Sequence, residues 1–262
     1  MQQETLDRLH SRYLVQATWT ALIREQLFDS IRIQATHKVL EVGSGTGVVS
    51  AEITHRFPVE CIGVDIDRSV VTFAHNIDPG SSYLAGDGCN LPLQPAAFDI
   101  TVCHFLLLWV ENPEKILNEM ARVTKPGGWI LALAEPDYGG RIDFPRELEA
   151  VGQRQIQALL DQGANPYLGR TLRSLFVSAQ LTEIRTGLLG GEWQGSPGEA
   201  QLDSEWETLA RDLNHLLPAG EIENYKRIDR KAWEMGTRVL FVPTFYAAGR
   251  VAPLRGPAQA TS

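Results

Sequence analysis

Glycines and acidic residues stand at regular places in the first third of the chain. Residues 39–42 form an apolar run interrupted only by Glu41, and a second apolar run ends in Asp65. Between these runs come three closely spaced glycines, Gly43, Gly45 and Gly47. This order predicts a strand, a tight turn, a helix and a second strand that ends in a carboxylate. Such a site suits a nucleoside, because bare backbone can approach the ligand and the carboxylate can accept two ribose hydroxyls.

The glycine spacing bears on which nucleoside is bound. A dinucleotide site has the pattern G-x-G-x-x-G/A, and Val48 stands where the third small residue belongs. Glu41 would also repel a pyrophosphate, whereas it suits a ligand with a cationic end. The chain lacks the Tyr-x-x-x-Lys pattern of many hydride-transfer sites. An NAD(P)-dependent oxidoreductase is therefore an alternative, but a less favoured one.

Further motifs follow in a fixed order. After Asp65 come Gly86-Asp87-Gly88, a run opened by Phe98-Asp99 and closed by Cys103-His104, and Lys125-Pro126-Gly127-Gly128. With this order and spacing, residues 35–136 resemble the class I S-adenosylmethionine (SAM) methyltransferases. The closest resemblance is to the broad group that includes quinone-biosynthesis and small-metabolite methyltransferases. Each motif is weak by itself, whereas the ordered set is specific.

The resemblance implies a cofactor site for SAM. Its expected members are Glu41, Gly43, Ser44, Gly45, Gly47, Asp65, Ile66, Gly86, Asp87, Gly88, Cys103 and His104. The glycine turn would face the methionine and ribose parts, and Glu41 would complement the cationic end. Asp65 would accept both ribose hydroxyls, Ile66 would lie against the adenine, and Asp87 would accept from its amino group. Cys103 and His104 would lie nearest the sulfonium, although a small buried residue is the plainer interpretation of Cys103.

Methyl transfer from a sulfonium is an in-line displacement that depends mainly on alignment and exclusion of water. A general base helps only where the acceptor must lose a proton early. His104 is the best candidate base by position, and a hydrogen-bonded histidine in the pocket wall is the alternative. Glu135, Asp137 and Tyr138 follow the fifth strand, at the expected rim. Asp137 and Tyr138 are candidates to orient the acceptor, or they simply form a turn.

The alternation of strand and helix patterns from residue 38 onward predicts an α/β fold with a Rossmann-like sheet. By resemblance we expect seven strands in the order 3-2-1-4-5-7-6, the seventh antiparallel, with helices on both faces. A single domain would span 1–252. It would comprise an N-terminal helical lid at 1–34, the SAM-binding core at 35–136 and a helical cap inserted at 190–236. We expect residues 253–262 to be a disordered tail.

Composition limits the possible partners. The chain has 262 residues and a formal net charge of −8 with no basic run, which argues against nucleic acid as a substrate. No apolar run approaches the roughly 20 residues of a membrane span. Its cysteines, Cys61, Cys89 and Cys103, lack metal-ligand spacing, so we expect no metal site. The start of the chain is polar, without the pattern of a secretory signal, which favours a cytoplasmic protein.

The sequence therefore predicts a SAM-dependent methyltransferase that acts on a small organic molecule. A non-catalytic SAM-binding or regulatory protein with the same fold is the main alternative, because fold does not fix function. The acceptor, the atom methylated and the oligomeric state do not follow from the sequence.

Overall fold

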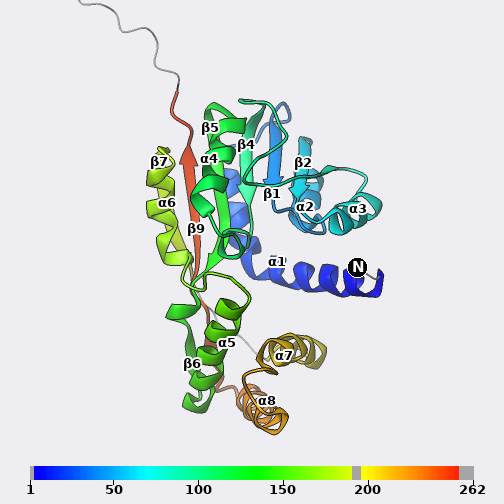
Figure 1. Ribbon diagram of the computed structural model, residues 1–262, viewed down its shortest axis with the longest axis vertical. Helices are drawn as coiled ribbons and strands as arrows, with labels where there is room; N and C mark the ends of the chain where they lie inside the picture. Colours follow the sequence, from blue (N-terminus) through cyan, green and yellow to red (C-terminus); the bar gives the residue numbers. More distant parts are fainter. Residues whose placement is uncertain (1–2, 191–195, 254–262) are drawn as a thin grey trace, which may run out of the picture.

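The computed structural model describes residues 3–190 and 196–253 (Figure 1). Residues 254–262, which make up nearly all of the predicted tail, lie outside the described residues. None of the helices in the described ranges is long and apolar enough to cross a membrane.

A seven-stranded sheet forms the centre of the fold. Its strands are β1 (Lys38–Val42), β2 (Glu60–Asp65), β3 (Ser82–Ala85), β4 (Phe98–Cys103), β5 (Thr124–Pro136), β7 (Thr182–Leu189) and β9 (Thr244–Arg250). They lie in the order β3-β2-β1-β4-β5-β9-β7, and β9 is antiparallel to both of its neighbours. In sequence order of these seven strands this is 3-2-1-4-5-7-6, so the predicted topology is confirmed.

Helices cover both faces of the sheet. On one face, α1 (Gln3–Ile31) and α2 (Val48–Arg56) bury side chains such as Phe28 and Ile53 against the strands. On the other face, α4 (Pro113–Val123) and α6 (Leu172–Ser178) bury Leu117 and Phe176. The helix α3 (Arg68–Ile77) meets the N-terminal half of α1, where Leu6 packs on Val70 and Phe73. The Asn112 side chain caps α4 by accepting from the N–H of Lys115 at 2.9 Å, as its sequence indicates.

A second, smaller unit lies beyond the carboxyl ends of the strands, with α1 between it and the sheet in Figure 1. It contains α5 (Glu149–Asp161), α7 (Glu199–Leu213), α8 (Ala219–Glu234) and a two-stranded sheet of β6 (Ile142–Phe144) and β8 (Val239–Phe241). Short 3₁₀ turns at Leu107–Trp109, Tyr138–Gly140, Arg146–Leu148 and Gly169–Thr171 connect the elements.

The small unit differs in two ways from the predicted cap. It includes α5, which precedes the predicted insertion, because α5 and α7 share a core of residues such as Val151 and Trp206. The predicted last strand at 239–248 is also divided into β8 and β9, separated by Val242 and Pro243. Proline has no N–H for a strand ladder, which accounts for the break.

A buried ionic network holds this unit together. Asp143 on β6 accepts from Arg141 at 2.5 Å and from Arg238 at 2.8 Å. Arg238 also donates to Asp229 of α8 at 2.6 Å, and Asp229 accepts from the indole N–H of Trp206 on α7 at 2.9 Å. The network thus joins β6, α7 and α8 through paired charges that are shielded from water.

Candidate functional site

The glycine turn has a backbone that only glycine adopts easily. Gly43, Gly45 and Gly47 have φ angles of +73°, +50° and +84°. These angles lie in the left-handed region, which other residues enter at a cost. The N–H groups of Gly43 and Ser44 both donate to the carbonyl of Val64, at 2.8 and 3.0 Å. The turn is therefore fixed directly against the end of β2.

Asp65 closes the site from β2. Its Oδ2 accepts from the N–H of Gly45 at 2.8 Å, and its Oδ1 accepts from the N–H of Asp67 at 3.0 Å. Each carboxylate oxygen has a second lone pair, so both can accept a further hydrogen bond. The neighbouring Ile66 side chain is 75% exposed. The carboxylate and an apolar surface are therefore adjacent and accessible, as a ribose and an adenine require.

Several side chains outside the sequence motifs lie directly on the turn. A Cβ placed at Gly45 would come within 2.8 Å of the Tyr13 ring of α1, and one at Gly43 within 2.6 Å of Leu106. His10 of α1 also hydrogen-bonds Thr46 at 3.0 Å. Helix α1 therefore lies across the glycine turn. For the contacts made by α1, helical periodicity was the only signal in the sequence, and it does not show which face of the helix meets the turn.

Glu41 lies under the turn, on the face of the sheet covered by α2. It is 2% exposed and accepts a hydrogen bond from the Ser50 hydroxyl at 2.5 Å. Burial, together with the nearby charge of Asp65, raises the pKa of Glu41 to about 8. A cation bound close to it would favour the ionised form.

The Gly86-Asp87-Gly88 segment follows β3. Asp87 is exposed, and its Oδ1 accepts from the N–H of Cys89 at 2.8 Å. A Cβ at Gly86 would lie 3.0 Å from Pro92, and one at Gly88 would lie 2.7 Å from Ile116. The small size of these two glycines therefore serves packing within the protein, in addition to any role beside a ligand.

At the end of β4, Cys103 and His104 differ in character. Cys103 is fully buried, and burial raises the pKa of its thiol well above the ordinary value, so the thiol stays protonated. The His104 ring turns toward α1, where its Nε2 lies 2.8 Å from the Thr20 hydroxyl. Burial and the charge of Arg24 lower the pKa of His104 to about 3. The imidazole is therefore neutral at physiological pH.

Glu135 is buried, although the sequence places it at the rim. Its carboxylate accepts from the N–H groups of Leu106, Leu107 and Leu108 at 3.0, 2.9 and 3.3 Å. These groups open the 3₁₀ turn after β4, a position that favours a negative charge. Glu135 therefore holds the loop that carries Leu106 against Gly43.

Asp137 and Tyr138 follow β5. Asp137 is 2% exposed and paired with Arg170, whose Nη2 donates to its Oδ1 at 2.7 Å. Tyr138 is half-buried, and burial raises the pKa of its hydroxyl. The Tyr138 hydroxyl makes no hydrogen bond with the residues that the structure describes. The charges of Arg12 on α1 and Asp212 on α7 both act on it.

These features suit a cationic nucleoside. The turn offers bare backbone, the adjoining carboxylates of Asp65 and Asp87 still have free lone pairs, and Glu41 lies below. The Ser44 hydroxyl is enclosed beside Gly63 of β2 and has no hydrogen-bond partner in the described part of the chain. No cluster of three or more His, Cys, Asp and Glu side chains within residues 3–190 and 196–253 could hold a metal ion.

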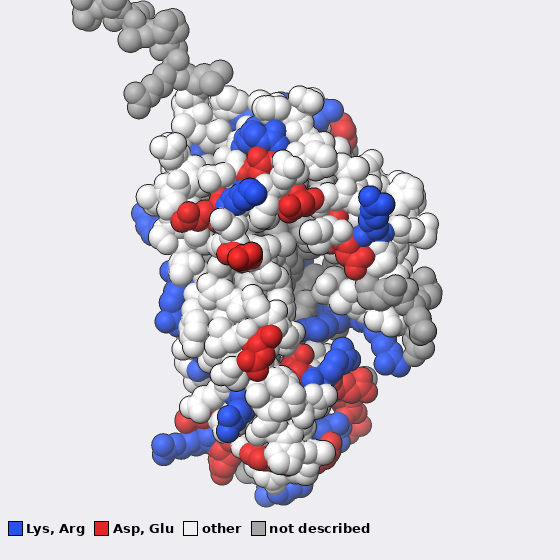
Figure 2. Space-filling view, viewed as in Figure 1, with Lys and Arg blue, Asp and Glu red and all other residues white. Residues whose placement is uncertain are grey.

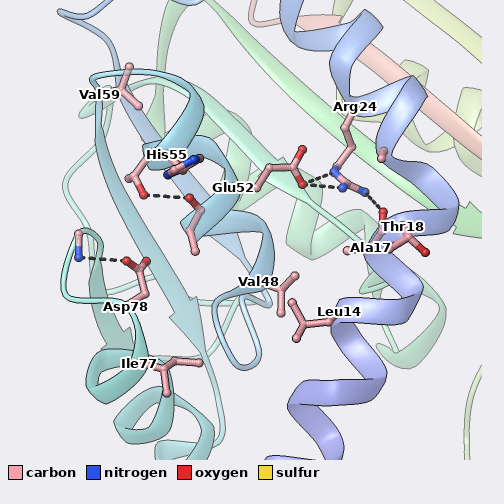
Figure 3. A pocket seen from close by; sticks show the side chains of 14 residues that line it. Leu14, Ala17, Thr18, Arg24, Val48, Glu52, His55, Val59, Ile77 and Asp78 are labelled. Atoms are coloured by element: carbon pink, nitrogen blue, oxygen red, sulfur yellow. Dashed lines mark hydrogen bonds and ion pairs between the residues drawn. The ribbon is translucent and has the colours of Figure 1, made fainter. Parts of the chain in front are cut away.

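An open groove, separate from the glycine turn, lies between α1 and α2 on the face of the sheet that these helices cover (Figure 3). Its volume is about 830 Å³, and Leu14, Ala17, Val48 and Ile77 supply much of its apolar wall. The Arg24–Glu52 ion pair crosses one end of the groove. The groove does not include the glycine turn or Asp65.

Comparison with known proteins places the chain in a family. Residues 40–132 match the family model described as a methyltransferase domain. The chain is 36% identical over 184 residues to the demethylmenaquinone methyltransferase of Mycobacterium bovis, covering 65% of this chain and 74% of that protein. The chain belongs to the methyltransferase family. The predicted membership is thereby confirmed.

Other curated relatives match over a smaller share of their own length, and the solved structures show only that the fold is shared. This methyltransferase chain spans 45–58% of the length of several other curated relatives. The solved structure of the YcgJ protein from Bacillus has a TM-score of 0.58 at 18% identity, covering 88% of this chain and 99% of that one. A Haemonchus contortus phosphoethanolamine N-methyltransferase in complex with SAM has a TM-score of 0.57 at 12% identity, covering 89% and 52%.

Proposed function

We propose that this protein is a SAM-dependent methyltransferase that methylates a small organic molecule. The observation that carries the proposal is the left-handed glycine turn with Asp65 hydrogen-bonded across it at the carboxyl end of the sheet. Ligands of open α/β sheets bind at this edge. Family membership supports the same activity, as does the SAM complex of a structural neighbour.

The proposed cofactor supplies a methyl group on a positively charged sulfur that is already an activated leaving group. Asp65 would accept the two ribose hydroxyls, and Asp87 would accept from the adenine amino group. The turn from Gly43 to Gly47, including Ser44, would lie with its backbone along the methionine part. Ionised Glu41 would complement the cationic end. All of these roles concern binding and orientation, which is most of what this displacement needs.

We propose that the acceptor enters where α1, the end of β5 and α7 come together. In Figure 2 the surface is hollowed between the sheet and the smaller unit, and charges of both signs are mixed around it. Tyr138 offers an unpaired hydroxyl there, and Arg12 forms no ion pair with the described residues. Arg141 and Arg170, the other arginines near this end of β5, are neutralised by Asp143 and Asp137.

Incubation of the full chain with methyl-labelled SAM and fractionated small-molecule extract tests the proposal. We expect label in an organic product and stoichiometric S-adenosylhomocysteine, the demethylated cofactor. Saturable SAM binding without label transfer to any fraction would instead favour the non-catalytic SAM-binding protein. A fluorescence change with NAD(P)H and no binding of SAM would favour the oxidoreductase. A protein without affinity for either nucleoside would contradict the proposal altogether.

A further inference from the structure

A chain of hydrogen bonds runs from the groove between α1 and α2 to the end of β4. Glu52 of α2 accepts from Nε of Arg24 at 2.9 Å (Figure 3). Arg24, which is 2% exposed, donates through Nη1 to the carbonyl of Ala17 at 2.8 Å and to the Thr20 hydroxyl. The Thr20 hydroxyl in turn lies 2.8 Å from Nε2 of His104.

The chemistry of these groups fixes the direction of the Arg24 bonds and restricts that of the bond between Thr20 and His104. A guanidinium has only donors, so the Thr20 oxygen accepts from Arg24. The single Thr20 proton is then shared between Nε2 of His104 at 2.8 Å and the carbonyl of Ala17 at 3.4 Å. The shorter contact is favoured, and the Ala17 carbonyl already accepts from Arg24. The geometry therefore favours Nε2 as the acceptor and the ring proton on Nδ1, because the reverse arrangement would leave the Thr20 proton only the 3.4 Å contact with the Ala17 carbonyl.

The remaining donor of the ring has no partner in the described part of the chain. His104 directly follows Cys103, which pairs with Val42, and Val42 directly precedes Gly43 of the cofactor turn. The His104 backbone therefore lies beside the turn, and the centroids of the His104 and Phe105 rings are 4.5 Å apart in an edge-on arrangement. His104 is only half-buried, and its Nδ1 is not among the fully enclosed unpaired atoms of the described residues, so a ligand can reach it. A ligand that covers Nδ1–H without accepting from it would leave a costly unpaired donor, so a ligand atom that accepts from it gains affinity.

We infer that His104 is a fixed hydrogen-bond donor, through Nδ1–H, to an oxygen of the bound cofactor or acceptor. Thr20 and Arg24 are positioning residues that set this tautomer. The inference rests on the proposed function for the identity of the ligand, and it excludes His104 as a general base. The reaction then needs an acceptor atom that is nucleophilic without proton removal by this ring. The oxygen belongs either to the cofactor carboxylate or to the acceptor molecule.

The tautomer can be measured without any ligand or activity. In the full chain labelled with ¹⁵N and ¹³C at histidine, the His104→Asn variant identifies the His104 signals by difference. We expect a neutral Nδ1–H ring from pH 8 to pH 5, because burial and Arg24 disfavour its charged form. An Nε2–H tautomer, or a ring that becomes charged within this range, would overturn the inference.

The surroundings of the ring contain other titrating groups. Arg24 faces it from α1, while the buried carboxyls Glu41 and Glu135 lie near the adjoining Cys103. The pKa values of these carboxyls are raised to about 8 and about 7, so they ionise within the titration. The spectra should therefore be repeated in Glu41→Gln, where the His104 tautomer should be unchanged. A tautomer that follows Glu41 instead of Thr20 would contradict the assignment.

Variants separate a donor at Nδ1 from a ring that only fills space. The amide of His104→Asn places an N–H near the site of Nδ1, whereas that of His104→Gln reaches the site of Nε2. We expect Asn to retain most of the function, and Gln and Ala to lose about ten- to a hundredfold. Thr20→Val should release the tautomer preference, and Thr20→Ser should restore it. Loss in Asn as large as in Ala, or retention in Gln, would contradict the inference.

Two constants show whether the oxygen that accepts from His104 belongs to the cofactor or to the acceptor molecule: the SAM dissociation constant and kcat/KM for the acceptor. A weaker SAM dissociation constant in His104→Ala, measured without acceptor, assigns the bond to the cofactor. An unchanged SAM constant with a lower kcat/KM for the acceptor assigns it to the acceptor. Either result supports the donor role, whereas no change in both would overturn it. If the protein transfers no methyl group, the tautomer spectra still test the ring, so the two proposals can fail separately.

Discussion

Glu41 and Glu135 are both buried carboxyl groups, but the protein offers them different numbers of hydrogen-bond donors. Glu135 accepts three backbone N–H groups at the start of a 3₁₀ turn, whereas Glu41 has the single hydroxyl of Ser50. Burial raises the pKa of Glu41 to about 8 and that of Glu135 to about 7. The better compensated group has the smaller shift, as expected when hydrogen bonds favour the ionised form.

The Glu41 shift makes stability depend on pH. The folded chain binds more protons than the unfolded chain between the ordinary pKa of 4.5 and the folded value of about 8. The stability that comes from protonated Glu41 is therefore complete below that pH window and is lost as the pH rises through it. Glu41→Gln removes the titration, so we expect the variant to exceed wild type by roughly 1–3 kcal/mol at pH 8.

Urea unfolding at pH 5 and pH 8 measures this difference. At pH 5 the two proteins should differ much less, because Glu41 is then neutral in the folded state. Glu60→Gln is a suitable control, since that carboxylate is half exposed and pairs only with Lys38 on the surface. A Glu41→Gln protein that is less stable than wild type at pH 8 would refute the raised pKa.

The sequence indicated the acids and glycines of the proposed cofactor site, but not which charged residues near the end of β5 are paired. Asp65 and the glycines follow local patterns that a chain displays within one strand–turn–helix unit. Arg141 and Arg170 follow the end of β5 in the chain, and each is bound to a buried aspartate. Arg170 and Asp137 are separated by 33 residues, so their pairing depends on tertiary structure.

Helix α1 has two halves with different environments. Its C-terminal half buries Ile23, Leu27 and Phe28 in the sheet core. Its N-terminal half is held mainly by Leu6 on α3 and by Tyr13 on the glycine turn. Segments with few buried apolar contacts open at low free energy. We therefore expect that, of the predicted lid at 1–34, the N-terminal half of α1 is the part that can open.

Hydrogen exchange with and without SAM tests this division. We expect SAM to slow exchange in residues 6–18, because a ligand on the turn extends the surface on which Tyr13 packs. Residues 23–31 serve as an internal control and should exchange at the same rate in both states. Equal protection of the first segment with and without SAM would rule out a lid in α1.

The strands themselves were predictable because each has its own local pattern of apolar residues, and their alternation with helices indicated a parallel sheet. The order of the strands in the sheet came from the resemblance to the class I methyltransferases. The boundary of the smaller unit was less predictable. Helix α5 joins it through a core shared with α7, and Arg238 reaches Asp143 across 95 residues. No local pattern encodes such a contact.

For the whole molecule, the ionic network of Arg141, Asp143, Asp229 and Arg238 is expected to determine whether the smaller unit stays folded. Replacing Arg238 with Met would leave Asp229 without its ion pair and weaken the pairing of Asp143. Both aspartates are nearly fully buried. We expect a loss of about 3–5 kcal/mol in the free energy of unfolding.

Arg230→Ala is the matched control for this prediction. Arg230 lies on α8, shortly before Arg238 in the chain, and it likewise pairs with an aspartate, Asp203, but both of these side chains are more than 40% exposed. Its removal should cost at most about 1 kcal/mol in denaturant unfolding. If the Arg238 and Arg230 variants lost the same stability, the network would not be the main stabilising feature of this unit.

The binding of SAM to the full chain tests the assigned site most directly. Titration calorimetry should give saturable binding to wild type and to Glu60→Gln. Glu60 lies on β2, as Asp65 does, but at the end of the strand away from the glycine turn. Asp65→Asn should bind roughly ten- to a hundredfold more weakly, because charge-assisted hydrogen bonds to the ribose are lost. Equal affinity of Asp65→Asn and wild type, or no heat with millimolar SAM, would contradict the site.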